Sequence, residues 1–192
     1  MMLPVTAYGL PILRKVAEEI DKDYPDLDQF IKDMFETMYV SDGIGLAAPQ
    51  VNRSIRLFII DGTPFADKMP EMADFKKVFI NPYILEESGK NVSMDEGCLS
   101  IPNIREDVNR QDEVTIEYFD ENWELKEEKY TGFAARVIQH EYDHLEGIMF
   151  TDKISPLRKT LIRRKLQDIS KGKVDVSYRM IFPIQKKSKK MA

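Results

Sequence analysis

The 192-residue sequence has very few of the residues that form covalent cross-links and metal clusters: it has one cysteine, Cys98, and two histidines, His140 and His144. A single cysteine excludes an internal disulfide, and a lone thiol in a reducing compartment is usually an inert small hydrophobe. No apolar run approaches the roughly 20 residues needed to span a bilayer, and the N-terminus lacks a signal-peptide pattern. The sequence therefore predicts a cytoplasmic protein with no membrane segment.

Composition and charge indicate one folded unit with two kinds of surface. With 43% hydrophobic and 32% charged residues, the chain can bury one good core, so residues 1–192 are expected to form a single domain. Residues 1–152 carry a net charge of −16, whereas residues 153–192 carry +11. We expect an acidic body and, over residues 155–192, a basic C-terminal helix, strand and tail.

Hydrophobic periodicity predicts helices and strands mixed without the βαβ regularity of parallel sheets. Helices are expected over 12–20 (short), 26–40, 132–146 and 156–169. Strands are expected over 55–61, 77–85, 113–120, 123–130 and 174–182, the third and fourth forming a hairpin. Residues 62–75 contain two prolines and no period, which predicts an inserted surface loop. The predicted fold is α+β, with antiparallel or mixed sheets packed around a central buried helix that carries the motif described next.

Both histidines fall within one motif, RVIQHEYDHLEG at residues 136–147, which contains the pattern HExxH. On a helix, positions i and i+4 lie on one face, so His140 and His144 can bind one ion. Glu141 is rotated by about 100° and can reach a water molecule at that ion. The neighbouring helical positions are apolar, and two neutral imidazoles in such surroundings need partners. The motif therefore predicts a metal site.

The third ligand separates the kinds of site. Phe150 stands where a third histidine would follow in the pattern HExxHxxGxxH, and no glutamate follows Glu146. Cys98, in the segment EGCLS (96–100), can supply a thiolate that closes a Cys-His-His site. Three protein ligands leave one position for water, as in catalytic sites. Other candidates for the third ligand are the downstream aspartates Asp152, Asp168 and Asp175.

Three segments now stand in order: GIGLAAPQ (43–50), EGCLS (96–100) and QHEYDHLEG (139–147). Together they resemble the three signature motifs of the peptide deformylases, and the likeness covers most of residues 5–155. The resemblance implies a metal-dependent hydrolase that removes the formyl group from N-formylmethionine of nascent polypeptides. It implies that Cys98, His140 and His144 bind one divalent ion, Fe²⁺ natively, for which Zn²⁺, Ni²⁺ or Co²⁺ can substitute.

The predicted chemistry needs an activated water, a site for the developing oxyanion and a proton for the leaving amine. A bound metal ion lowers the pKa of its water towards about 7, which makes that water the nucleophile. Glu141 can act as general base and then general acid. Gln50 can offer its side-chain amide, and Leu99 its backbone N–H, to the oxyanion. The resemblance implies the same three roles.

The predicted substrate pocket lies beside the metal. Phe133 and Val137 share a helical face with His140 and can hold an apolar side chain such as methionine. The resemblance adds Ile44, Gly45 and Met94 to the pocket, and it places Arg136 near the mouth and Arg105 near the substrate entrance. Glycines in the first motif leave room for an extended peptide backbone to pair with the loop edge. Arg110 and Asp143 are expected to pair behind the site.

The basic C-terminal region suggests a second partner. The segments PLRKTLIRRK (156–165) and KKSKK (186–190) concentrate cations that can contact ribosomal RNA through its phosphates. A solvated tail without a partner is the alternative. We also expect the protein to be a monomer and to act on N-formylmethionyl nascent peptides.

Two other functions also fit the sequence. One is a zinc endopeptidase that uses the same HExxH helix with a third ligand other than Cys98. The other is a non-catalytic protein that binds RNA or a partner and keeps a structural metal. The endopeptidase would cleave internal peptide bonds, and the non-catalytic protein would tolerate loss of Glu141.

Overall fold

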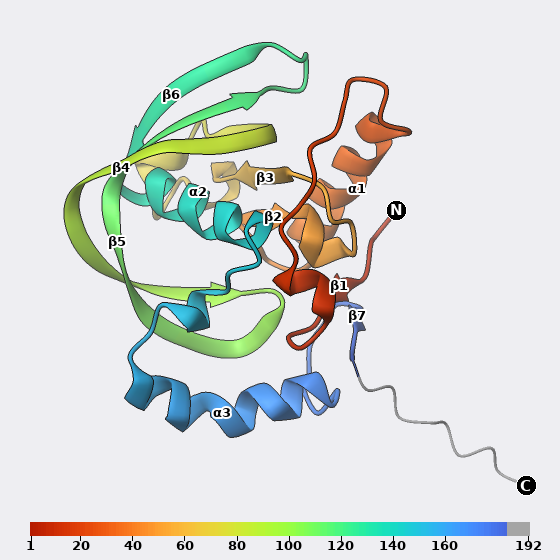
Figure 1. Ribbon diagram of the computed structural model, residues 1–192, viewed down its shortest axis with the longest axis vertical. Helices are drawn as coiled ribbons and strands as arrows, with labels where there is room; N and C mark the ends of the chain where they lie inside the picture. The colour runs from red at the N-terminus through yellow and green to blue at the C-terminus, as the bar shows by residue number, and fades with distance from the viewer. Residues whose placement is uncertain (184–192) are drawn as a thin grey trace, which may run out of the picture.

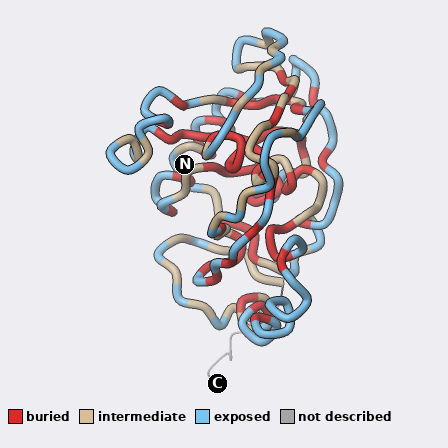
Figure 2. Tube along the Cα trace, turned by 90° about the vertical axis from the view of Figure 1, so that its left-hand side faces the viewer, coloured by how far each residue is buried: buried red, intermediate tan, exposed pale blue. Residues whose placement is uncertain are grey.

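The apolar segment around Phe58 becomes a strand that is buried on both faces. In the computed structural model, which describes residues 1–183, strand β3 (Leu57–Asp61) alternates between two hydrophobic clusters. Phe58 and Ile60 pack with helix α2 (Gly132–Leu145), while Leu57 and Ile59 pack with helix α1 (Leu27–Val40). A strand covered on both sides needs apolar residues at every position, which explains the uninterrupted run LFII. Figure 2 shows this buried interior enclosed by exposed edges and loops.

The main sheet is antiparallel, with the strand order β2-β3-β4-β5-β6. The other strands are β2 (Gly45–Ala47), β4 (Lys76–Cys98), β5 (Ile101–Phe119) and β6 (Leu125–Thr131). The long pair β4 and β5 has four register irregularities, and such bulges bend strands. Figure 1 shows both strands curving around α2. This curvature brings the far end of β4 back towards the helix.

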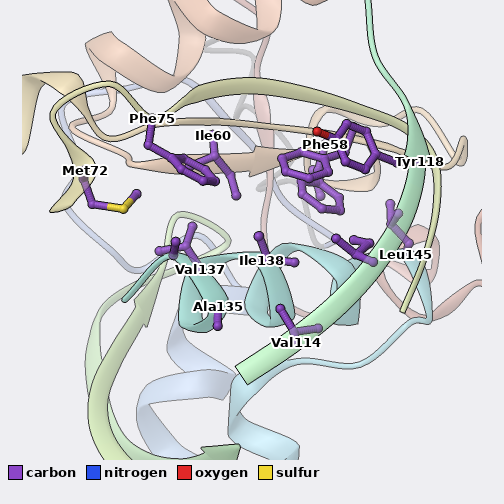
Figure 3. Packing of buried hydrophobic residues seen from close by; sticks show 14 of the residues in the cluster. Phe58, Ile60, Met72, Phe75, Val114, Tyr118, Ala135, Val137, Ile138 and Leu145 are labelled. Atoms are coloured by element: carbon purple, nitrogen blue, oxygen red, sulfur yellow. The ribbon is translucent and has the colours of Figure 1, made fainter. Parts of the chain in front are cut away.

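Helix α2 is held by contacts on most of its sides. Its residues Val137, Ile138 and Leu145 face the aromatic side chains of the sheet (Figure 3), and Ile138 and Leu145 are fully buried. Phe58 and Phe79 stack with their ring centroids 4.5 Å apart. The chain leaves the helix at Gly147, whose φ of +70° and close approach to the carbonyl of Arg14 disfavour any side chain.

The C-terminal region forms a separate layer below the sheet (Figure 1). Helix α3 (Pro156–Ser170) begins at Ser155, whose hydroxyl accepts a hydrogen bond from the N–H of Arg158. The apolar side of α3 packs under β5. The chain then rises to the short strand β7 (Met180–Ile181), which pairs in parallel with β1 (Val5–Thr6). Five 3-10 helices complete the described residues: Pro11–Arg14, Ala48–Val51, Thr63–Phe65, Pro70–Met72 and Phe150–Asp152.

The α+β class and the three long helices are confirmed, but several strands differ from expectation. The strand predicted over 77–85 continues to Cys98, because the polar continuation is stabilised by pairing with β5. The strand predicted over 174–182 is reduced to two residues, and the helix predicted over 12–20 is only the 3-10 turn Pro11–Arg14. The segment 62–75 is not purely a surface loop, because Met72 is fully buried and Phe75 joins the core.

Two further expectations concern the ends of the chain and the membrane. The segment KKSKK at 186–190 lies outside the described residues. Among residues 1–183, no helix is long and apolar enough to cross a bilayer.

We predict that Ile59→Ala lowers the free energy of unfolding by about 2–5 kcal/mol, because it leaves a cavity in a fully buried cluster between α1 and the sheet. Urea unfolding of the purified protein measures the change. Leu85→Ala in β4 is the matched control, since that leucine is 51% exposed and its loss should cost less than about 0.5 kcal/mol. Equal effects of the two substitutions would contradict this assignment of the core.

Candidate active site

Cys98 lies at the tip of a hairpin. It is the last residue of β4 and pairs with Ile101, the first residue of β5, so Leu99 and Ser100 form a two-residue turn. In such a turn the two central residues do not use their own N–H and C=O groups in the closing hydrogen bond. The motif EGCLS therefore places a thiol next to backbone groups that can bond to other parts of the chain, as the carbonyl of Ser100 does with the N–H of Tyr8 at 2.9 Å.

His140 and His144 stand one turn apart on α2, and their ring centroids are 5.1 Å apart. The Nε2 atom of His144 lies 3.3 Å from the Sγ atom of Cys98. Burial lowers the pKa of His144 well below its ordinary value, so this imidazole is neutral and can offer a lone pair. The hairpin tip and the helix thus bring together three side chains from distant parts of the sequence.

The ligand atoms of Cys98, His140 and His144 all lie within 4.8 Å of one another. In a tetrahedral site, a sulfur at 2.3 Å and a nitrogen at about 2.1 Å from one ion are separated by about 3.6 Å. The observed distance of 3.3 Å between Cys98 and His144 is close to that value. Among the described residues, no aspartate or glutamate joins this cluster. The donor set therefore fits a single divalent ion with a position left for another ligand.

Glu96 connects the histidines to the sheet. Its carboxylate contacts Nδ1 of His140 at 2.8 Å, which leaves Nε2 of that ring for the cluster. It also accepts two hydrogen bonds from Arg110, at 2.7 and 3.0 Å, and one from Arg136 at 2.8 Å. Burial opposes the negative charge, but the hydrogen bonds from His140 and Arg110 outweigh it and hold the pKa of Glu96 below its usual range. The expected pair of Arg110 and Asp143 is confirmed at 2.7 Å.

Glu141 projects into the space beside the cluster. A β-carbon at Gly45 would lie 2.5 Å from one of its carboxylate oxygens, so only glycine leaves room for this side chain. The other oxygen is buried without a hydrogen-bond partner among residues 1–183. Burial raises the pKa of Glu141 to about 7. A carboxylate in this state can accept and return a proton near neutral pH.

Gln50 is held so that its amide nitrogen points at the site. Its side-chain oxygen accepts a hydrogen bond from the N–H of Ala47 at 2.9 Å, which fixes the orientation of the amide. The Nε2 atom then lies 3.3 Å from both the sulfur of Cys98 and the hydroxyl of Ser100. Gln50 is only 2% exposed, so it is part of the packed interior and not a solvated loop residue.

A cavity of about 690 Å³ opens beside the cluster. It is lined by most of the residues predicted from the sequence: Ile44, Gly45, Gln50, Cys98, Leu99, Arg105, Phe133, Arg136, Val137, His140 and Glu141. Arg136 is buried and ion-paired with Glu96, so it lies deeper than the mouth where it was expected. Arg105 pairs with Asp95 at the exposed rim.

Met94 does not line the cavity. It lies four residues before Cys98 on β4. The three residues between them, Asp95, Glu96 and Gly97, all line the cavity, so the part of β4 that borders it begins one residue after Met94.

Sequence reasoning missed two groups of residues in the site. Glu96 directly precedes Gly97 in EGCLS, and its acidic character next to a ligand was a usable signal for a partner of histidine. The cavity is also lined by residues 175–178, which follow α3. No local pattern connects that segment with the motifs, because the contact is made only in the folded chain.

Comparisons with known proteins agree with the geometry. The family model described as polypeptide deformylase matches residues 2–160. A peptide deformylase of Christiangramia forsetii is 57% identical, covering 98% of this chain and 100% of the relative. The crystal structure of a peptide deformylase from Legionella pneumophila has a TM-score of 0.78 at 34% identity, covering 90% of this chain and 98% of that one. The corresponding structure from Thermotoga maritima has a TM-score of 0.73 at 40% identity, covering 81% and 99%.

Family membership favours neither an endopeptidase nor a non-catalytic binding protein. The match spans all three motifs and the whole cluster of Cys98, His140 and His144. The chain belongs to the peptide deformylases, metal-dependent hydrolases that remove the formyl group from nascent polypeptides.

Proposed function

We propose that Cys98, His140 and His144 hold the catalytic ion and that Glu141, Gln50 and Leu99 carry the reaction around it. The observation that carries this proposal is that the ligand atoms of Cys98, His140 and His144 lie within 4.8 Å of one another, beside a cavity that Glu141, Gln50 and Leu99 also line. We propose Fe²⁺ as the natural ion, with Zn²⁺, Ni²⁺ or Co²⁺ able to replace it. In this arrangement α2 is the central helix of the fold, because it carries both imidazoles and the catalytic carboxylate.

The bound ion supplies Lewis-acid activation of water and of the formyl group. Glu141 accepts a proton from the attacking water at the carboxylate oxygen that has no hydrogen-bond partner among residues 1–183. It then delivers that proton to the amide nitrogen as the bond to the formyl carbon breaks, which yields formate and a free amine. The Nε2–H group of Gln50 and the backbone N–H of Leu99 donate to the oxygen on which charge develops.

The walls of the cavity account for the choice of substrate. Ile44, Phe133 and Val137 present apolar surface beside the cluster, which suits the unbranched side chain of methionine. Gly45 belongs to the predicted peptide-pairing edge and is the first residue of β2, the outer strand of the main sheet. Arg105 stands at the rim, where residues after methionine would leave the cavity.

We predict that the wild-type protein releases formate from formyl-Met-Ala-Ser, and that Glu141→Gln lowers kcat by about 10²–10⁴ while the metal content stays the same. Cys98→Ser should lose both metal and activity, because one of three ligands is weakened. A coupled assay for formate and elemental analysis give the two readings.

The same peptide separates this proposal from the other two functions. Cleavage of an internal peptide bond of formyl-Met-Ala-Ser, without release of formate, would indicate an endopeptidase. Full activity of Glu141→Gln would exclude the proposed role of that carboxylate.

We also predict that Glu96→Gln weakens metal binding by about 10- to 100-fold, because His140 loses the carboxylate that orients its ring. The substitution leaves Arg110 and Arg136 with less compensating charge in the interior, so stability should fall as well. Competition with a chromogenic chelator measures the affinity. Glu106→Gln is the control, since Glu106 is also buried and lies opposite Glu96 on β5, but its carboxylate pairs with Arg158 and not with a histidine. Equal metal affinity in both variants would contradict the role of Glu96.

We further propose that residues 1–192 act as one catalytic domain, monomeric and cytoplasmic, whose basic C-terminal region contacts ribosomal RNA. The support is the exposed face of α3, where Arg163, Arg164 and Lys165 follow one another. Arg158, on the same helix, is instead engaged by Glu106 through two hydrogen bonds. Contacts of this kind are made to phosphates and carry no sequence preference.

Replacing Arg163, Arg164 and Lys165 together by alanine should weaken binding to ribosomes and make it less sensitive to salt. Co-sedimentation with purified ribosomes over a range of salt concentrations measures both. The control removes three exposed lysines of the acidic body, Lys22, Lys68 and Lys90. Equal binding by both triple variants would remove the ribosome proposal and leave the deformylase site untouched.

A further inference from the structure

A short C-terminal segment crosses the active-site cavity. Residues Val174–Tyr178, here called the C-terminal strap, connect α3 with β7, and Asp175, Val176, Ser177 and Tyr178 line the same cavity as Cys98 and Glu141. The strap begins 14 residues after the last residue matched by the family model, which ends at residue 160. The strap therefore lies outside the region matched by the family model, and it still lines the active-site cavity.

The strap is anchored at both ends. Before the strap, the α3 residues Ile162, Leu166 and Ile169 are buried under β5. The guanidinium of Arg158, also on α3, donates hydrogen bonds of 2.6 and 2.8 Å to the buried carboxylate of Glu106. After it, β7 pairs with β1 over two residues. Figure 1 shows β7 beside β1, with the chain rising from α3 to reach it. Val174 also packs against the cluster under β5. A segment fixed in this way forms a wall and not a loose tail.

The strap touches the catalytic hairpin directly. The hydroxyl of Tyr178 donates a hydrogen bond of 2.8 Å to the carbonyl of Leu99. That carbonyl belongs to the turn residue next to the ligand Cys98, where the turn leaves it free for an outside partner. Burial raises the pKa of the Tyr178 phenol, so it keeps its proton and stays a donor at neutral pH. A second contact, from the side chain of Asn103 to the carbonyl of Asp175 at 3.2 Å, ties the strap to β5.

We propose that the C-terminal strap is a wall of the peptide-binding groove and that Tyr178 is a positioning residue, which holds Leu99 through its carbonyl. This inference rests on the proposed role of the Leu99 N–H as a donor to the developing oxyanion. A residue whose carbonyl is held by a partly buried phenol has less freedom to turn its N–H away from the formyl oxygen. Such fixed donors stabilise the transition state more than the bound substrate, so loss of the Tyr178 hydroxyl should lower kcat.

The test is steady-state kinetics of Tyr178→Phe with formyl-Met-Ala-Ser. This substitution removes only the hydroxyl, and we expect kcat to fall about three- to tenfold, the equivalent of one hydrogen bond, with KM changed less than about twofold. Metal content and melting temperature should match the wild type. Tyr83→Phe is the control, because Tyr83 also donates through its hydroxyl, to Glu19 at 2.7 Å, but lies on the exposed outer side of β4.

A second variant, Tyr178→Ala, tests the wall. Removing the ring should raise KM for formyl-Met-Ala-Ser at least threefold more than KM for formyl-methionine amide, which has no residues after methionine to meet the strap. Wild-type kinetics for both variants would overturn the inference. So would losses of kcat that merely follow a lower melting temperature or lower metal content. If the wild type itself fails to release formate, the proposed function fails; if only the Tyr178 variants behave as wild type, the function stands and the strap has no part in it.

Discussion

The carboxylate of Glu96 holds the site together, because it joins the strand that carries Cys98 to the helix that carries both imidazoles. It is buried, and it meets His140, Arg110 and Arg136 at hydrogen-bond distance. Charges in a low-dielectric interior are tolerable only when they are paired and their hydrogen bonds are satisfied. Here Glu96 and Asp143 offset the charges of the two arginines, and Lys153 approaches Asp143 from the more exposed side at 3.5 Å. The orientation of the metal-binding face of α2 depends on that balance.

Rigidity of the site comes from where its parts are placed in the fold. The thiol lies beside a two-residue turn, and the imidazoles lie on a buried helix. The side-chain amide of Gln50 is held in place because its oxygen accepts a hydrogen bond from the N–H of Ala47. Each of these supports is covered by a hydrophobic cluster, and β3 contributes to clusters on both of its faces. Small displacements would have to move packed side chains, which interiors of native density resist. A preorganised site of this kind keeps its donors aimed before the substrate arrives.

Periodicity and motifs were sufficient for much of this architecture, and their failures have physical causes. Helices α1, α2 and α3 carry apolar residues at helical spacing, so they were located to within one or two residues. The second half of β4 escaped notice because its sequence, ESGKNVSMDEG, is polar and bulged; it is a strand only because β5 pairs with it. Cys98, His140 and His144 were singled out because each belongs to a compact motif, and the structure brings their side chains together. Tyr178 had no such signal, since its link with Leu99 spans 79 positions and exists only in the folded chain.

The parallel pairing of β1 with β7 has a consequence for how the molecule is made. Strand β1 can find its partner only after residue 181 has left the ribosome, although the helix with both histidines is complete some 36 residues earlier. A chain emerging from its N-terminus can therefore collapse its core and gather the thiol and imidazoles first. Until β7 is available, the backbone groups of β1 that pair with it lack this partner. The same late event that joins β7 to β1 also fixes one end of the C-terminal strap, so the cluster of thiol and imidazoles can form before the outer side of the groove is in place.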